Sequence, residues 1–195
     1  MYEPKNFSHL IGTPGFSDQM LNNHFTLYQG YVKNFNALNN ALVALEKEEK
    51  FGTAEYAELN RRFGWEWNGM RLHELYFGNM AKQGKPLAPD SALAVAIAKE
   101  FGSMDAWQKD FTSIGVMRGI GWVILYYDKP ADRLFDVWVS EHAENHLAGA
   151  TPLLVMDMWE HAFMLDYGLK KTDYISAFMK ATDWNVIEER FIKVI

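Results

Sequence analysis

The chain has 195 residues, of which 49% are hydrophobic and 15% aromatic, and its formal net charge is −6. This composition predicts a folded globular protein of one or two small domains and argues against a disordered chain. The acidic balance and the lack of any basic block provide no electrostatic surface for nucleic acid, so no nucleic-acid partner is expected.

Three further features of the sequence bear on the setting of the protein. Residues 1–5 lead into no apolar signal core, and no run of about 18 apolar residues could cross a bilayer. The chain contains no cysteine and therefore no disulfide framework, which fits a reducing compartment. We expect a cytoplasmic protein with no membrane partner.

Two long helices are predicted in the first part of the chain. Apolar and aromatic residues recur at intervals of three and four over residues 24–45, the spacing of one helix face, and His24 lies on that face. A second helical stretch, over about residues 54–80, carries His73 on a similar face. The polar connection 46–52 would join the two helices into an antiparallel hairpin that brings the histidines together.

A mixed domain is predicted after the linker segment 83–89, where glycine and proline break the helical pattern. Asp90 is expected to cap a helix that ends at Gly102, and Ser103 is expected to cap the next helix. From Gly121 the period of the pattern changes to that of strands. Strands are expected at residues 122–127, 135–140 and 153–156, and closing helices around residues 174–181 and 186–193.

The predicted fold class is therefore α+β. An antiparallel helical hairpin is expected in residues 1–85. An α+β domain with a small antiparallel sheet of about three strands is expected in residues 86–195.

The segment Asp157-Met158-Trp159-Glu160-His161 carries the strongest functional signal. It places a carboxylate and an imidazole four residues apart after an apolar run, and this spacing can direct both groups at one ion. With His24 and His73, the chain offers three imidazoles and one carboxylate to a single site. Such ligands without thiolate suit iron, manganese or zinc. The alternative is a strand-end carboxylate and an ordinary buried histidine.

Four motifs follow one another along the chain: His24; His73-Glu74-Leu75-Tyr76-Phe77; Gly119-Ile120-Gly121-Trp122; and Asp157-Met158-Trp159-Glu160-His161-Ala162-Phe163. Their order resembles the iron/manganese superoxide dismutase family over nearly the whole chain. The resemblance implies one iron or manganese ion per chain between the two domains, with iron slightly favoured, and a fifth position for water or hydroxide. The implied ligands are His24, His73, Asp157 and His161.

The resemblance also implies the reaction, which converts two superoxide anions and two protons to dioxygen and hydrogen peroxide. Tyr31 is expected to guard substrate entry, with Tyr28 as a rival. In the family this tyrosine usually comes eight residues after the first histidine, whereas Tyr31 comes seven residues after His24. Residues matching the aromatic wall of the family's metal site are Trp122, Trp159 and Tyr76.

Gly69 stands where many iron-type relatives carry a glutamine that reaches the metal-bound solvent. Because glycine has no side chain, we expect His142 from the sheet domain to donate that hydrogen bond instead. The alternative is that His142 is a surface loop residue. His146 and His9 are expected to be ordinary histidines.

Glu160 is expected to reach the partner's His161 across a two-fold axis, which implies a homodimer. Relatives often add a histidine–tyrosine contact there, and the matching positions of this chain are Tyr28 and Met164.

Two other functions are weighed. A di-iron helical protein would need Glu-x-x-His pairs, and the chain has none. The second alternative is a non-catalytic metal-binding or interaction protein that retains the superoxide dismutase fold.

Overall fold

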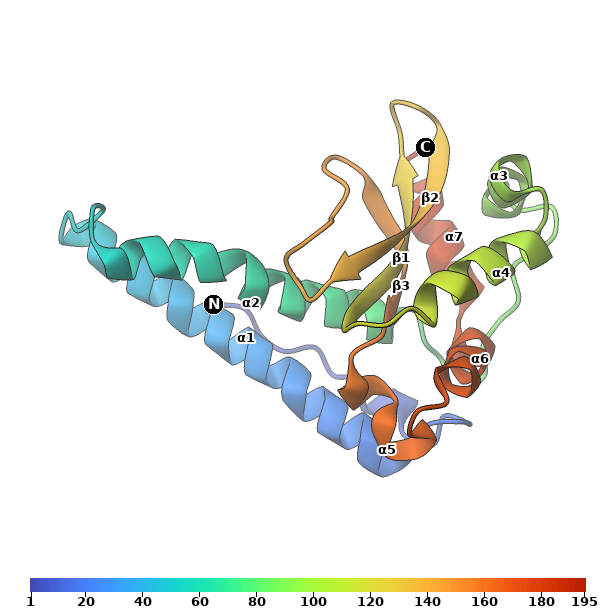
Figure 1. Ribbon diagram of the computed structural model, residues 1–195, viewed down its shortest axis with the longest axis horizontal. Helices are drawn as coiled ribbons and strands as arrows, with labels where there is room; N and C mark the ends of the chain where they lie inside the picture. The colour runs from blue at the N-terminus through green and yellow to red at the C-terminus, as the bar shows by residue number, and fades with distance from the viewer.

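Two long helices form the first part of the computed structural model, which describes residues 1–195 (Figure 1). α1 (Asp18–Lys47) and α2 (Ala54–Gly78) pack against each other as an antiparallel hairpin. The side chains of Ser17 and Thr53 each accept a hydrogen bond from a backbone nitrogen in the first turn, so each helix begins at a capping residue. The predicted helical hairpin is confirmed.

A three-stranded antiparallel sheet lies beside the hairpin, in the order β2-β1-β3. Its strands are β1 (Gly121–Asp128), β2 (Arg133–Ser140) and β3 (Thr151–Asp157). A Cβ atom at Gly121 would lie 2.0 Å from the Val139 carbonyl oxygen, so only glycine fits at the start of β1. The register of β1 and β3 then pairs the next residue, Trp122, with Asp157.

The remaining helices follow the predicted order, with one corrected cap. The side chain of Ser91, not Asp90, accepts from the Ala94 nitrogen, because an N-cap oxygen reaches the nitrogen two or three residues further on. Gly102 ends that helix at φ +88°, and Ser103 caps the next, as predicted. The elements are α3 (Ala92–Phe101), α4 (Met104–Gly115), α6 (Lys171–Ala181) and α7 (Trp184–Ile192), with three short helices that were not predicted, η1 (Ser8–Leu10), η2 (Glu160–Ala162) and α5 (Met164–Tyr167).

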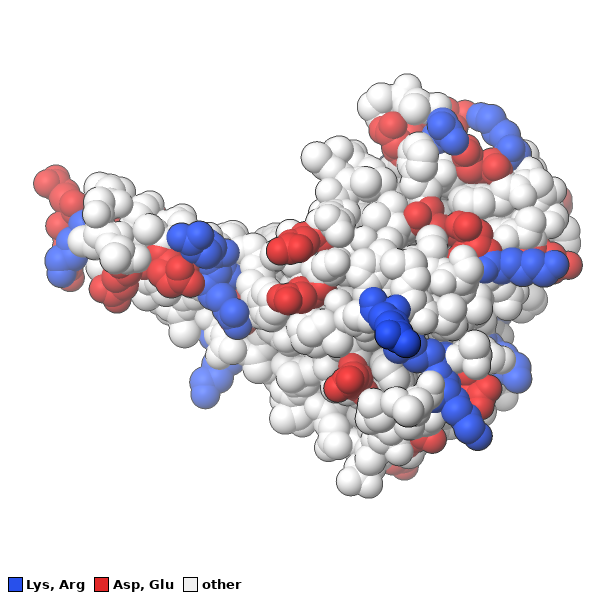
Figure 2. Space-filling view, viewed as in Figure 1, with Lys and Arg blue, Asp and Glu red and all other residues white.

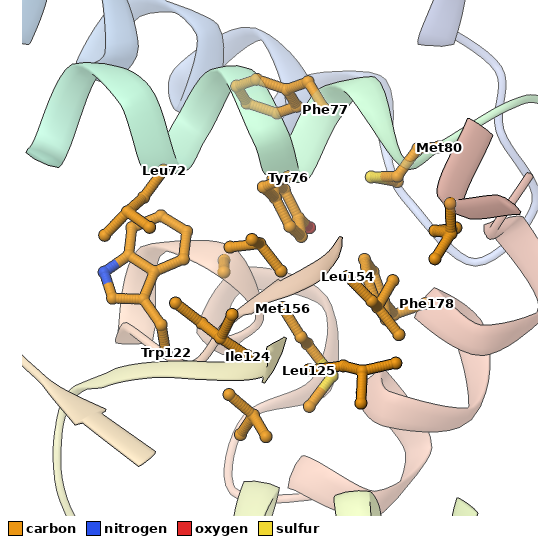
Figure 3. Close-up of a cluster of buried hydrophobic side chains, with 14 of the residues drawn as sticks. Leu72, Tyr76, Phe77, Met80, Trp122, Ile124, Leu125, Leu154, Met156 and Phe178 are labelled. Atoms are coloured by element: carbon orange, nitrogen blue, oxygen red, sulfur yellow. The ribbon is translucent and has the colours of Figure 1, made fainter. Parts of the chain in front are cut away.

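The hydrophobic core between α2 and the sheet connects the two parts of the chain. Figure 3 shows side chains from α2, β1, β3 and α6 meeting in one cluster. All of the labelled side chains are buried. Burial of apolar surface is the dominant favourable contribution to folding. They are Leu72, Tyr76, Phe77, Met80, Trp122, Ile124, Leu125, Leu154, Met156 and Phe178.

The far end of the hairpin extends away from the sheet and carries charged side chains of both signs (Figure 2). No helix in the structure combines the length and the apolar character that a bilayer crossing requires. The α+β fold is confirmed by these elements and by the antiparallel sheet. The division into residues 1–85 and 86–195 stays a proposal.

Candidate metal centre

Four titratable side chains from four elements meet where the hairpin contacts the sheet domain. His24 comes from α1, His73 from α2, Asp157 from the end of β3 and His161 from η2. One potential ligand atom of each lies within 4.8 Å of the others. We call these four residues the ligand cluster. The first three are at most 2% exposed, and His161 is partly exposed.

The distances within the ligand cluster suit a single ion. The Oδ2 atom of Asp157 lies 3.2 Å from the Nε2 atoms of both His24 and His161, and 3.6 Å from that of His73. Two ligand atoms about 2.1 Å from a shared ion, at angles of about 90° to 120°, are about 3.0 to 3.6 Å apart. All three separations are close to that interval.

His73 provides the sharpest test of whether these residues fit a metal. Its Nδ1 atom lies 2.5 Å from the Gly69 carbonyl oxygen, which can only accept, so Nδ1 carries the hydrogen. In the neutral ring, Nε2 then holds a lone pair, and this buried atom has no hydrogen-bond partner. An unpartnered buried polar atom is costly, and a bound metal would remove that cost. The residues therefore fit a metal.

The carboxylate of Asp157 is held in place by its neighbours. Its Oδ1 atom accepts a hydrogen bond of 2.8 Å from the backbone nitrogen of Trp159, which directs Oδ2 toward the histidines. The hydroxyl of Tyr174 donates to the Asp157 carbonyl oxygen at 2.7 Å and lies 3.2 Å from the hydroxyl of Tyr76. The ring of Tyr76 also packs against His24, with centroids 5.2 Å apart.

Burial and charge set the protonation states of the ligand cluster. Burial lowers the pKa of His24 and lowers that of His73 well below its ordinary value, so both imidazoles are neutral at pH 7. Burial alone would raise the pKa of Asp157, but its interactions with His161 and His24 outweigh burial and lower it. Neutral imidazoles and an ionised carboxylate are the forms that bind metals.

Tyr31 and Tyr28 both lie beside His73, but their hydroxyls have different partners. The ring of Tyr31 stacks on His73 with centroids 5.3 Å apart, and its hydroxyl lies 2.7 Å from Nε2 of His142. The hydroxyl of Tyr28 accepts from the Lys5 backbone nitrogen and donates to Glu74. The ring of Tyr28 also stacks on His73, with centroids 6.3 Å apart, so the two tyrosines differ in what their hydroxyls bond rather than in their distance from the site.

The ring of Tyr31 occupies the space above Gly69. A Cβ atom at position 69 would lie 2.4 Å from this ring, closer than side-chain contacts allow. Glycine at this position therefore makes room for the Tyr31 ring.

His142 is fully buried next to the ligand cluster and is not a surface residue. Its Nδ1 atom accepts a hydrogen bond of 3.1 Å from the Trp122 indole nitrogen, which can only donate. In the neutral ring, Nε2 therefore carries the hydrogen and donates to Tyr31. Burial lowers the pKa of His142 to about 4, so the neutral ring is the form at pH 7.

Aromatic rings surround these groups. Trp122 meets His73 edge to face with centroids 5.0 Å apart, and Trp159 stacks on His161 at 6.0 Å and on His142 at 4.7 Å. The walls predicted from the sequence thus lie at the site. Glu160 differs from them because its side chain is exposed.

Three residues near the site were missed from the sequence. Trp65 packs edge to face on His142 with centroids 5.0 Å apart, and Tyr174 holds Asp157. Trp65, Gly69 and His73 follow one another at intervals of four residues on one face of α2. This spacing could have indicated from the sequence that Trp65 lies near the site. His146 contacts the main chain of His142, and nothing in its own sequence neighbourhood indicated that contact.

Comparison with known proteins agrees with this geometry. The family model for the C-terminal domain of iron/manganese superoxide dismutases matches residues 89–190. An iron superoxide dismutase of Cupriavidus metallidurans is 38% identical over 183 residues, which cover 91% of this chain and 89% of the relative. A manganese superoxide dismutase of Haloferax volcanii is 36% identical over 179 residues, which cover 91% of this chain and 88% of the relative. An iron superoxide dismutase of Aquifex pyrophilus is 34% identical over 196 residues, which cover 98% of this chain and 91% of the relative.

Proposed function

The chain belongs to the iron/manganese superoxide dismutase family, and on that premise we propose how its own residues hold the metal and serve the reaction. It is an oxidoreductase that converts two superoxide anions and two protons to dioxygen and hydrogen peroxide. One iron or manganese ion belongs to the site formed by His24, His73, Asp157 and His161. A metal ion held by these four residues would supply the one-electron chemistry of the reaction.

We propose that each residue of the ligand cluster provides one ligand atom. The observation that carries this proposal is the buried Nε2 atom of His73, which has no hydrogen-bond partner and lies 3.6 Å from Oδ2 of Asp157. The other two histidines place their Nε2 atoms 3.2 Å from the same oxygen. This convergence favours a dismutase over a non-catalytic protein that keeps the fold.

Tyr31 is the group that we propose for guiding superoxide and for donating a hydrogen bond toward the ligand cluster. Because the Tyr31 oxygen accepts from His142, the hydroxyl hydrogen is free to point elsewhere. Burial raises the pKa of Tyr31 to about 12, so the hydroxyl keeps its proton at pH 7 and can donate to an anion. Tyr31 is also only partly buried, as a residue at a substrate entrance must be.

His142 serves the site through Tyr31 in this proposal. Trp122 donates to His142, and His142 donates to Tyr31, so the three side chains form one directed chain of hydrogen bonds. Direct donation from His142 to solvent at the metal stays a prediction. Both ring nitrogens of His142 already have partners. For this donation, the Nε2 hydrogen would have to leave the Tyr31 oxygen or be shared between that oxygen and the solvent.

Iron is the metal that we propose, ahead of manganese. The relative from Cupriavidus metallidurans and that from Aquifex pyrophilus are named for iron, whereas the Haloferax volcanii relative is named for manganese. The ligand types do not separate the two metals, since both accept imidazole and carboxylate. A cytoplasmic location likewise stays an expectation.

A homodimer is proposed from the surface beside His161. Exposed apolar side chains lie on α5, just after it and on the loop before β1, and exposed apolar residues that cluster mark interaction sites. Lys171 bonds to the Met117 carbonyl oxygen and lies over the Phe163 ring, which shows that the two segments are neighbours. The exposed residues are Met117, Ile120, Met164, Leu165 and Leu169.

Glu160 lies next to this surface, where it can reach the partner's His161. Tyr28 is 1% exposed, so it cannot pack against Met164 across the interface without a rearrangement. Met164 is 37% exposed and remains available for apolar contact.

Metal reconstitution tests the proposed function. Metal-free protein should take up about one ion per chain when it is supplied with iron or manganese, and the iron form should dismutate superoxide faster than the manganese form. Metal content measured by elemental analysis and superoxide turnover measured on the same sample decide the matter. A chain that fills with metal but lacks turnover in both forms would contradict the assignment of the reacting residues. A faster manganese form would contradict only the choice of iron.

A further inference from the structure

His142 lies in the loop between β2 and β3, outside the regular strands of the sheet. We call residues 141–149 the His142 segment. Glu141 and Asn145 both adopt positive φ angles, at 53° and 69°. Asparagine tolerates such a conformation, but it is unfavourable for glutamate, so the surrounding structure must hold Glu141 in place. A buried ring on such a loop needs support at its main chain.

His146 supplies that support from within the same segment. Its Nε2 atom lies 2.9 Å from the His142 carbonyl oxygen, and its Nδ1 atom lies 2.9 Å from the hydroxyl of Tyr126. The carbonyl oxygen can only accept, so Nε2 carries the hydrogen. In the neutral ring, Nδ1 then accepts from Tyr126. Both nitrogens of His146 are therefore used, one on the loop and one on the sheet.

One strand holds His142 at two points. Trp122 and Tyr126 lie four residues apart on β1, so their side chains leave the same face of the strand. Trp122 donates to the His142 ring, and Tyr126 reaches the His142 main chain through His146. β1 is the central strand of the sheet, and Tyr126 is 2% exposed, so this attachment starts from a rigid, buried base.

We propose that His146 is a positioning residue for the dismutase reaction, which with Tyr126 fixes the main chain of His142 so that its ring stays bonded to Trp122 and Tyr31. The inference rests on the role proposed above for His142 and Tyr31. The two hydrogen bonds of the His146 ring go to Tyr126 and to the His142 main chain and not to the ligand cluster, so His146 acts through His142.

Three substitutions separate this role from a general effect on folding. His146→Leu removes both hydrogen bonds and keeps an apolar side chain of moderate size. His146→Gln can restore them, because its amide nitrogen can donate to His142 and its amide oxygen can accept from Tyr126. Tyr126→Phe removes one hydroxyl and keeps the ring, so it serves as the milder variant if the leucine variant folds poorly. His9→Leu is the matched control, because His9 is exposed and distant in sequence from His146.

The deciding measurement is the position of the His142 ring in crystal structures of the metal-loaded variants. In His146→Leu we expect the ring to be displaced from Trp122 and Tyr31, with metal content unchanged and turnover about tenfold lower, in line with the loss of one outer partner of a metal site. His146→Gln should return the ring and most of the turnover. In the double variant His142→Ala/His146→Leu, turnover should match that of His142→Ala within about twofold, because the second change has nothing left to position.

A His142 ring that keeps both of its hydrogen bonds in His146→Leu and in Tyr126→Phe would overturn the inference, whatever the turnover. A displaced ring supports it. If the ring is displaced but turnover stays normal, and His142→Ala is also fully active, the positioning role stands and the proposed role of His142 in the reaction is wrong.

Discussion

The ligand cluster and the His142 segment lie next to each other, but their polar atoms are satisfied in different ways. In the ligand cluster, Nε2 of His73 has no hydrogen-bond partner and three imidazoles converge on one carboxylate oxygen. In the His142 segment, both ring nitrogens of His142 and of His146 have protein partners. The first region needs an ion to be complete, and the second is complete without one. Changes in the ligand cluster should therefore act on metal binding, and changes around His142 should act on turnover at constant metal content.

The largest expected effect comes from breaking the ligand cluster itself. His161→Ala removes one of four ligand atoms, and the three that remain are expected to hold the ion at least 100-fold more weakly, beyond the effect of losing an outer partner. Metal content and superoxide turnover should fall together, as measured by elemental analysis and an activity assay on one sample. His9→Ala is the control at an exposed histidine. Full metal content with full activity in His161→Ala would sink the ligand assignment.

Adding one carbon at Gly69 should disturb the contact between Tyr31 and His142 and leave metal binding by the ligand cluster intact. In Gly69→Ala the new Cβ atom would lie 2.4 Å from the Tyr31 ring, so the ring must move and its bond to His142 should break. We expect turnover to fall about 10- to 100-fold while metal content stays near one ion per chain. Gly64→Ala on the same helix is the matched control, since nothing lies within 4 Å of a Cβ atom there. Equal turnover in the two variants would show that the Tyr31 position is unimportant.

Glu160→Ala tests the comparison next to His161, which is the most exposed member of the ligand cluster. The side chain of His161 is 27% exposed to solvent. If a second subunit covers this side, the variant should dimerise about tenfold more weakly and lose metal faster. Light scattering over a dilution series and metal release to a chelator provide the two readings. A wild-type chain that is monomeric and fully active at micromolar concentration would reject the dimer.

The pH dependence of stability should report on His142. Burial lowers its pKa from the ordinary 6.5 to about 4. Between these values the unfolded chain binds a proton that the folded chain does not, so the stability from this group is fully present above about pH 6.5 and is lost as the pH falls toward 4. In metal-free His142→Gln, the slope of unfolding free energy against pH should be smaller by up to about 1.4 kcal/mol per pH unit. Urea denaturation between pH 7 and 4.5 measures it, and identical slopes would contradict the burial of a neutral ring.

Tyr28→Phe should have the smallest effect on activity. The Tyr28 hydroxyl bonds to Lys5 and Glu74 and to no member of the ligand cluster, so its loss should cost about 1 kcal/mol of stability and leave turnover within about twofold. Tyr31→Phe provides the comparison, with a larger loss of turnover at similar stability. If the two variants exchanged these results, Tyr28 would be the entrance residue.

Much of the fold was predictable because it rests on local periodicity. The spacing of apolar residues predicted the hairpin that brings His24 and His73 together, and the change of period at Gly121 predicted the sheet. The cap at Asp90 was wrong by one residue, since Asp and Ser are both good caps and the pattern cannot choose between neighbours.

The surroundings of the site were less predictable because they depend on contacts between distant segments. The bond from Tyr31 to His142 spans 111 positions, and the bond from Tyr174 to Asp157 joins a helix to a strand end. No periodic pattern indicates such pairs. His146 also follows directly after Asn145, whose positive φ is a loop conformation that the sequence alone did not indicate.

Anomalous X-ray diffraction from crystals of the metal-loaded protein tests the central claim most directly. The account predicts one strong peak per chain at the absorption edge of iron or manganese, bonded to Nε2 of His24, His73 and His161 and to Oδ2 of Asp157 at about 2.0 to 2.3 Å. It also predicts that His142 keeps its bonds to Trp122 and Tyr31 and does not bind the metal. A peak elsewhere, or one bonded to His142 in place of a member of the ligand cluster, would contradict it.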